Sequence, residues 1–221
     1  MNYLTSQVLI KEEIEILIKS INKQKDLWED GKKTAGFHAS KVKKNLQLKR
    51  DSNLSIKYSE LITKKILSNE LIKSFALPKK VHGTIFSKTK SGMKYGRHID
   101  NAYMSSGRAD LSFTIFLNNK NNYEGGALSI ESFNSEEKFK LDAGEIIIYP
   151  STNLHSVEEV FDGERLVFIG WIESYVKSIE DREYLFDLDA AARSLLAKYG
   201  RSDEVDLIFK SYSNLLRRLG S

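Results

Sequence analysis

Apolar residues at helical spacing mark both ends of the chain. Between residues 9 and 25 they recur every three or four positions, with lysine and glutamate between them, which predicts an amphipathic helix. A second such pattern runs from Ser55 to Ala76 and is stopped by Pro78. Residues 31–53, which lie between the two, have no clean period, so we expect a loop or an irregular arm there.

The central block, from Val81 to Ile172, changes to short strand-like runs separated by turn residues. About eight short strands in one block favour a barrel or a jelly-roll sandwich. Helical patterns then return over residues 175–199 and 203–219, with Gly200 between them. The expected strands are 81–88, 95–100, 110–118, 126–133, 137–141, 145–149, 154–160 and 165–172.

Length and composition fit one domain with helical additions. The 221 residues divide into an N-terminal part (1–80), a strand-rich core (81–174) and a C-terminal helical segment (175–221). Zero cysteines exclude disulfides and thiolate zinc sites. The sequence shows no secretory signal and no apolar run long enough to cross a membrane, so a cytoplasmic protein without a membrane partner is expected.

The net charge of +4 hides an asymmetry between the two halves. Residues 1–97 contain 21 Lys and Arg against 9 Asp and Glu, whereas residues 98–221 contain 13 against 21. A basic half can attract nucleic acid or another acidic partner. Nearly all of these basic residues are lysines, without arginine clusters or interleaved aromatics, which favours a solvated surface and leaves nucleic acid as a lesser alternative.

The candidate chemistry begins at His98-Ile99-Asp100. On an extended strand, residues i and i+2 point to the same side, so His98 and Asp100 can reach one ion. His155 would complete a set of two imidazoles and one carboxylate, which leaves open positions on a non-haem Fe(II). Such a tripeptide is common by chance, and the set gains weight from Arg165, ten residues after His155.

Arg165 shares one face of the last expected strand with Val167, Ile169 and Trp171. An arginine on an apolar, inward face is costly unless it is paired with an anion, and a dicarboxylate would be such an anion. A tight hairpin at Asp162-Gly163 would point Arg165 away from the histidine at 155. The site therefore requires a longer loop or a crossing between two sheets at that point.

Seven segments, spread through nearly the whole chain, carry a resemblance to a known family. They are TAGFHASKVKKNLQL, YGRHIDNA, RADLSFTIFLN, YEGGALSIE, LDAGEIIIYPSTNLHSV, GERLVFIGWIES and LFDLDAA. In order and spacing they resemble the PKHD-type hydroxylases, of the prolyl 4-hydroxylase-like branch of the Fe(II)/2-oxoglutarate dioxygenases.

What the resemblance implies is an α+β protein with a double-stranded β-helix (jelly-roll) core and N- and C-terminal helices packed around it. By position, His98, Asp100 and His155 would be the metal ligands, and Arg165 would bind the distal carboxylate of 2-oxoglutarate. One departure is Thr89, where relatives usually have a tyrosine that contacts the co-substrate. Residues implied to line the co-substrate pocket are Tyr95, Leu128, Val157 and Trp171, with Thr114 facing inward together with Ser112 and Phe116.

The resemblance further implies an oxygenase that uses Fe(II), 2-oxoglutarate and O₂, and it leaves L-ascorbate open as a bound reductant. A prolyl residue in a peptide or protein is the first choice of substrate. A free amino acid or other small molecule is the alternative, followed by a nucleic acid, or by a metal-binding scaffold without turnover. Leu185, Phe186, Leu188, Leu195, Leu196 and Leu207 could pack within the chain or form a dimer contact, so the oligomeric state stays open.

Three other residues have competing interpretations. His38 lies in the arm that resembles the family's substrate-side loop and could touch substrate, although an ordinary loop histidine is the more frequent case. His82 begins an expected strand and is interpreted as structural, and Trp28 as a residue that packs against a helix.

Overall fold

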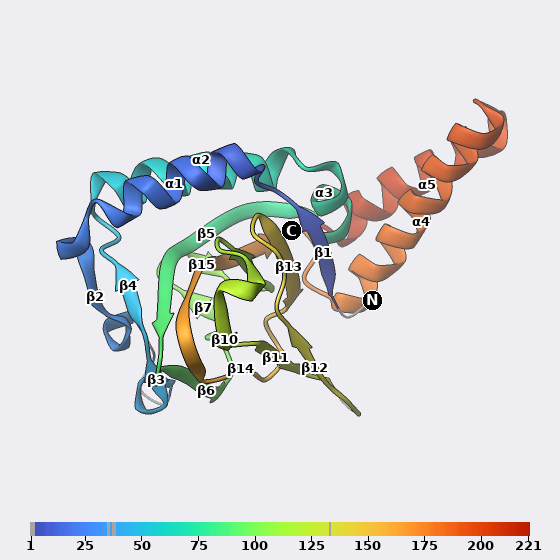
Figure 1. Ribbon diagram of the computed structural model, residues 1–221. Helices are drawn as coiled ribbons and strands as arrows, with labels where there is room; N and C mark the ends of the chain where they lie inside the picture. Colours follow the sequence, from blue (N-terminus) through green and yellow to red (C-terminus); the bar gives the residue numbers. More distant parts are fainter. Residues whose placement is uncertain (1–2, 35, 37–38, 133) are drawn as a thin grey trace.

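The computed structural model describes residues 3–34, 36, 39–132 and 134–221, and its centre is a pair of packed antiparallel sheets (Figure 1). In spatial order the large sheet contains β1 (Leu4–Gln7), β13 (Glu145–Pro150), β9 (Leu111–Phe116), β15 (Val160–Ser174), β5 (Pro78–Lys90), β4 (Leu46–Leu48) and β2 (Trp28–Asp30), and β10 (Tyr123–Gly125) pairs with β15. The small sheet contains β12 (Glu136–Phe139), β11 (Leu128–Glu131), β14 (His155–Val157), β6 (Lys94–His98) and β3 (Lys43–Lys44).

The two sheets pack through an apolar cluster that includes Phe116, Ile147 and Val167 from the large sheet and Leu128 and Ile130 from the small one. This confirms the expected α+β fold with a jelly-roll core, to which β1, β2, β3 and β4 add strands from before residue 81. A separate two-stranded hairpin, β7 (Tyr103–Met104) and β8 (Gly107–Arg108), lies beside it.

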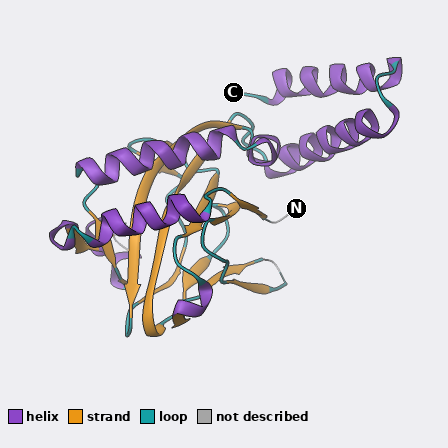
Figure 2. Ribbon diagram, turned by 45° about the horizontal axis from the view of Figure 1, so that its top comes forward, coloured by secondary structure: helices purple, strands orange, loops and turns teal. Residues whose placement is uncertain are grey.

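Helices cover the other face of the large sheet. Helices α1 (Lys11–Asn22) and α2 (Asn53–Ser68) lie across it, and α3 (Glu70–Ala76) follows (Figures 1 and 2). Because helices cover one face and the small sheet covers the other, every residue of β9 is buried. The resulting core joins helix and sheet residues such as Ile21, Ile62, Phe86, Phe113 and Phe168.

The single helix expected over Ser55–Ala76 is wrong in one respect, because the chain breaks at Asn69. This residue is extended, and its side-chain oxygen accepts a hydrogen bond from the Ile72 amide, which caps α3. Pro78 does stop the helical pattern, and it begins β5 directly.

Helices α4 (Ile179–Tyr199) and α5 (Asp203–Leu219) confirm the two C-terminal patterns and form a hairpin that extends away from the sheets (Figure 2). The first part of α4 packs against the core, where Phe186 lies edge-on against Phe75 and Leu185 is buried, and Tyr212, Leu216 and Leu219 of α5 pack against the cluster around Leu185. Leu195, Leu196 and Leu207 are exposed. Among the described residues, no helix is both long and apolar enough to cross a membrane.

The irregular arm expected over residues 31–53 is partly wrong, because it contains two short strands. Strand β4 joins β5 in the large sheet, and β3 joins β6 in the small one. Strand β1 at the N-terminus was also not expected. Strands of two to four residues show too little alternation to be read from sequence.

The expected strand break at Asp162-Gly163 is wrong, since both residues lie within β15. Gly163 has φ +75°, and a β-carbon there would lie 2.4 Å from the Asn122 carbonyl oxygen, so this close approach requires glycine. The chain instead crosses from the small sheet to the large one between β14 and β15, as the site geometry required. Arg165 consequently points inward and is 2% exposed.

Phe168→Ala is expected to lower the free energy of unfolding by about 3–5 kcal/mol, because it leaves a cavity in the core. The Phe168 ring is fully buried, with its centroid 4.7 Å from that of Phe86 and 6.0 Å from that of Phe113. Urea denaturation measures the loss. Phe161→Ala is the control, because Phe161 lies on the same strand and is 63% exposed. Equal losses in both variants would contradict this account of the core.

Candidate active site

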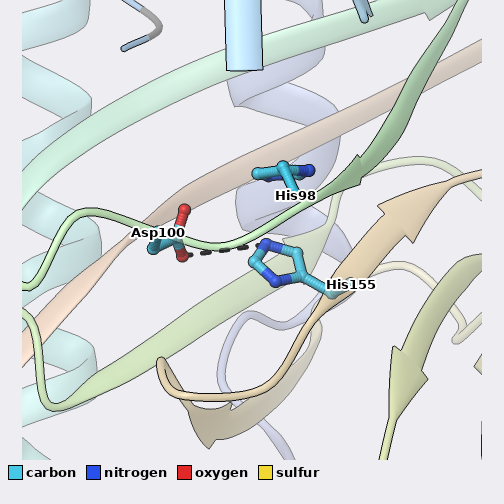
Figure 3. Close-up of side chains that lie close together, drawn as sticks. All are labelled: His98, Asp100 and His155. Carbon is cyan, nitrogen blue, oxygen red and sulfur yellow. Dashed lines mark ion pairs between the residues drawn. The ribbon is translucent and has the colours of Figure 1, made fainter. Parts of the chain in front are cut away.

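Two histidines and one aspartate converge inside the jelly roll (Figure 3). His98 ends β6 and His155 begins β14, and these strands pair with the two histidines opposite each other. Their ring centroids are 4.2 Å apart, and Nε2 of His155 lies 3.7 Å from Oδ2 of Asp100. One nitrogen or oxygen atom from each residue lies within 4.8 Å of the others, so a single ion could contact all three.

The strand expected over residues 95–100 is slightly too long, since β6 ends at His98 and Asp100 lies just beyond it. His98 and Asp100 therefore come together because the chain turns after β6 ends. The expectation that both residues share one side of a single strand was only partly correct.

Backbone carbonyls fix the orientation of both imidazoles. Nδ1 of His98 lies 2.8 Å from the Gly96 carbonyl oxygen, and Nδ1 of His155 lies 3.0 Å from that of Asn153. A carbonyl can only accept, so each Nδ1 donates, and in the neutral form of each ring Nε2 keeps its lone pair. Burial, followed by the charge of His155, lowers the pKa of His98 to about 4. His98 is therefore neutral at pH 7, which is the form that binds metal ions.

Asp100 is held by two donors. Its Oδ2 accepts from the indole nitrogen of Trp171 at 2.8 Å and from the hydroxyl of Ser112 at 2.6 Å, while Ser112 is 2.8 Å from the hydroxyl of Ser151. The indole packs against Gly83, where a β-carbon would lie 2.7 Å from the ring. Gly83 thus lets Trp171 reach the aspartate.

A cavity of about 400 Å³ adjoins these residues, and Arg165 lines it. The Arg165 guanidinium lies 5.2 Å from the centre of the Phe116 ring, and its Nε has no hydrogen-bond partner in the described part of the chain. No described carboxylate forms an ion pair with it. Burial lowers the pKa of Arg165, because the charged form is desolvated. A buried cation of this kind requires an anion as its partner.

Most of the residues expected at the co-substrate pocket line this cavity, and their role toward a co-substrate stays a prediction. Tyr95, Val157 and Leu128 are cross-strand neighbours in one row of the small sheet, and the Tyr95 ring stacks on His98 with centroids 3.6 Å apart. From the large sheet, Thr114 and Trp171 line the cavity as well. Ser112 also lines it, whereas Phe116 lies beneath Arg165.

Two tyrosines near Arg165 were not found from the sequence. Tyr149 lines the cavity, and burial raises the pKa of its phenol well above the usual range, so it stays a neutral hydrogen-bond donor. The Tyr123 hydroxyl is buried beside the Arg165 side chain. Thr89 is the cross-strand partner of Arg165 and is 3% exposed. Alternation along Ile147 and Tyr149 in β13 was the signal that could have placed Tyr149 inward.

The contacts of His82 and Trp28 fit the structural roles expected for them. The ring nitrogens of His82 lie 2.8 Å from the Ser106 hydroxyl and 2.9 Å from the Arg108 carbonyl oxygen, so this residue anchors the β7–β8 hairpin. Trp28 packs against the core beside α1 and α2, with the Lys88 ammonium 4.3 Å from the centre of its ring. His38 lies outside the described residues.

Comparison with known proteins identifies two family regions in the chain. Residues 84–173 match the 2OG-Fe(II) oxygenase superfamily, and residues 180–220 match the PKHD-type hydroxylase C-terminal domain. A PKHD-type hydroxylase from Prochlorococcus marinus strain MIT 9215 is 74% identical over 220 residues, with 100% of both chains covered.

Solved structures share the fold at low sequence identity. A prolyl hydroxylase from Trichoplax adhaerens, in complex with a hypoxia-inducible factor oxygen degradation domain peptide, aligns with TM-score 0.56 and 15% identity and covers 83% of this chain and 86% of its own. A non-haem α-ketoglutarate-dependent epimerase from nogalamycin biosynthesis aligns with TM-score 0.59 and 12% identity, covering 79% and 78%. With both family regions and a full-length relative at this identity, the chain belongs to the PKHD-type hydroxylases, within the 2-oxoglutarate- and Fe(II)-dependent oxygenases.

Proposed function

We propose that this dioxygenase hydroxylates a prolyl residue in a peptide or protein, with Fe(II) bound by His98, Asp100 and His155. The observation that carries the proposal is one cavity that contains both this triad and a buried arginine without a counter-charge. Two imidazoles and a carboxylate form the facial set that suits non-haem Fe(II).

The bound iron supplies oxidative chemistry, in which O₂ is reduced while 2-oxoglutarate loses CO₂ to become succinate and the substrate gains one oxygen atom. The protein's own residues orient the reactants. Arg165 would bind the distal carboxylate of the co-substrate through charge-assisted hydrogen bonds. Tyr149 and Tyr123 lie near Arg165 as neutral hydrogen-bond donors. In this arrangement Tyr149 and Tyr123 take the role of the tyrosine that Thr89 replaces.

The walls of the cavity keep the co-substrate away from water. Leu128 and Val157 are apolar, and the Tyr95 ring covers His98. Ser112 and Trp171 hold Asp100 in position. Because these groups are fixed before the reactants bind, little reorganisation is required during the reaction.

A prolyl substrate is supported by the Trichoplax neighbour, which is named a prolyl hydroxylase and is bound to a peptide. A free amino acid or another small molecule is the second candidate, and the likeness to the nogalamycin epimerase favours it. The use of L-ascorbate as a reductant belongs to the same proposal.

An assay of succinate formation and of oxygen gain by the substrate distinguishes a peptide substrate from a free amino acid. The purified protein with Fe(II), 2-oxoglutarate and O₂ is expected to form succinate, and proline-containing peptides should gain one oxygen atom in a mass spectrum. Added ascorbate should prolong turnover if it acts as a reductant. Oxygen gain by free amino acids alone would contradict the peptide assignment, and no succinate under any condition would contradict the reaction itself.

Trp171→Phe is expected to weaken divalent-metal binding by about tenfold, because the indole donor that orients Asp100 is lost. Titration with Mn(II), followed by electron paramagnetic resonance, measures the affinity. Trp28→Phe is the matched control, since it removes the chain's other indole at a distance from the site. Unchanged Mn(II) affinity in Trp171→Phe would show that this hydrogen bond does not prepare the aspartate for metal.

A further inference from the structure

A second buried cation, Lys43, lines the same cavity as the metal triad. It lies in β3 at the edge of the small sheet and is 5% exposed. Its ammonium nitrogen is 5.0 Å from the centre of the Tyr95 ring and donates a hydrogen bond to the Thr34 hydroxyl at 3.3 Å. Neither partner carries a negative charge, so Lys43 is buried without an ion pair to any described residue.

Strand register separates Lys43 from the proposed co-substrate site. Lys43 pairs with Tyr95, Tyr95 with Val157 and Val157 with Leu128, so these four side chains form one row on the inner face. Three strand spacings of about 4.8 Å put the backbones at the ends of this row roughly 14 Å apart.

Arg165 belongs to the other end of that row. A β-carbon on Gly126, two residues before Leu128, would lie 3.3 Å from Cδ of Arg165. Between the ends, the next pair along β6 and β14 is His98 and His155. The cavity is therefore lined by two buried cations, one at each end of this row.

Arg50 adds a second positive charge beside Lys43. It lines the cavity and donates a hydrogen bond to the Gly83 carbonyl oxygen at 3.3 Å. Burial, followed by the charge of Arg50, lowers the pKa of Lys43 to about 8, so the ammonium is still mostly protonated at pH 7. Neither Lys43, which is buried, nor Arg50, which is exposed, forms an ion pair with a described carboxylate, so the two cations create a positive field at this wall of the cavity.

We infer that Lys43, assisted by Arg50, binds a carboxylate of the substrate, and that the enzyme acts on molecules with a carboxylate close to the hydroxylated carbon. This inference rests on the proposed oxygenase function and narrows its substrate class. The carboxylate is either the free C-terminal group of a peptide or amino acid, or an acidic side chain next to the target residue. Arg165 binds the co-substrate, and Lys43 holds the molecule to be oxidised.

The test compares acids with matched amides on the protein loaded with Mn(II) and saturating 2-oxoglutarate, which cannot turn over. The probes are N-acetylproline against N-acetylprolinamide, N-acetylleucine against its amide, and N-acetyl-Pro-Glu-amide against N-acetyl-Pro-Gln-amide, titrated by protein NMR. The first two pairs test a terminal carboxylate, and the third tests an acidic side chain. We expect at least one acid to bind about tenfold tighter than its amide, since a charge-assisted hydrogen bond is lost in the amide.

Variants of Lys43 and Arg50 test whether these two residues cause the preference for acids over amides. Lys43→Met should remove it, Arg50→Gln should weaken it, and Lys43→Arg should keep most of it. Lys44→Met is the matched control, because Lys44 is the exposed neighbour on β3 whose ammonium donates to the Gly92 carbonyl oxygen. Thermal unfolding of each variant checks that the fold is intact. If Lys43→Met does not fold, Lys43→Gln and the probe titrations of Arg50→Gln take its place.

Several results would overturn the inference: equal binding of acids and amides, no binding of any probe, or a preference that survives in Lys43→Met. A fourth is a loss of 2-oxoglutarate affinity in Lys43→Met as large as in an Arg165 variant, because the lysine would then serve the co-substrate. An acid preference shared by proline and leucine probes would support the carboxylate site while contradicting the prolyl assignment. Failure to form succinate would contradict the proposed function. The comparison of acids with amides would still be interpretable, because it measures binding without turnover.

Discussion

Asp100→Ala is expected to abolish detectable 2-oxoglutarate turnover and to weaken divalent-metal binding by at least about 100-fold. Loss of a group that only orients a ligand costs about 10- to 100-fold in metal affinity, and loss of the ligand itself costs more. Asp100 is also the only carboxylate of the triad, so the variant leaves two neutral imidazoles to hold a dication. The freed Trp171 and Ser112 donors then point at an apolar methyl group.

Mn(II) titration and a succinate assay measure the two effects of Asp100→Ala. Asp142→Ala is the control, because its carboxylate pairs at the surface with Lys120 at 3.0 Å, and such pairs contribute little. Metal affinity that is retained in Asp100→Ala would remove this residue from the metal site.

Arg165→Gln is expected to weaken 2-oxoglutarate binding by about 2–5 kcal/mol, which is more than about 25-fold, while Mn(II) affinity changes little. The guanidinium is buried and has no described counter-charge, so a bound carboxylate would gain nearly the full strength of a desolvated ion pair. The glutamine keeps hydrogen-bonding capacity but lacks the charge. Selective loss of co-substrate affinity would distinguish this role from a general effect on folding.

Titration of 2-oxoglutarate into the Mn(II)-loaded protein measures this loss. Arg97→Gln is the matched control, since the Arg97 side chain is 61% exposed and pairs with Glu131 outside the cavity. If Arg165→Gln binds 2-oxoglutarate as tightly as Arg97→Gln does, then Arg165 has been given the wrong role.

Elements with a long apolar period could be predicted from the sequence, and very short ones could not. The helices over residues 11–22, 179–199 and 203–219 match their patterns because each has several turns of repeated apolar residues. Strands β3 and β4 have two and three residues, and they exist because the edges of β6 and β5 are available for pairing. The break at Asn69 depends on a local cap that competes with helix continuation.

Some residues of the candidate site could likewise be predicted from the sequence, and others could not. His98, Asp100 and His155 could be selected because such donor residues are scarce in this chain and their types match one metal. Lys43 and Tyr123 could not, because the chain contains many lysines and tyrosines and only sheet register brings these two to the cavity region. Tertiary pairing, which has no local signal, decides which common residue becomes part of a site.

Strand β15 contributes to both halves of the cavity. It presents Arg165 on the co-substrate side and, six residues later, Trp171 to the carboxylate of Asp100, and β5 and β9 hold it on either side. Anything that fixes one end of this strand also restricts the other. Thermodynamic reciprocity then requires that, if metal tightens 2-oxoglutarate binding by some factor, 2-oxoglutarate tightens metal binding by the same factor. At low cellular iron, the co-substrate concentration would thus help to decide how much of the enzyme retains its metal.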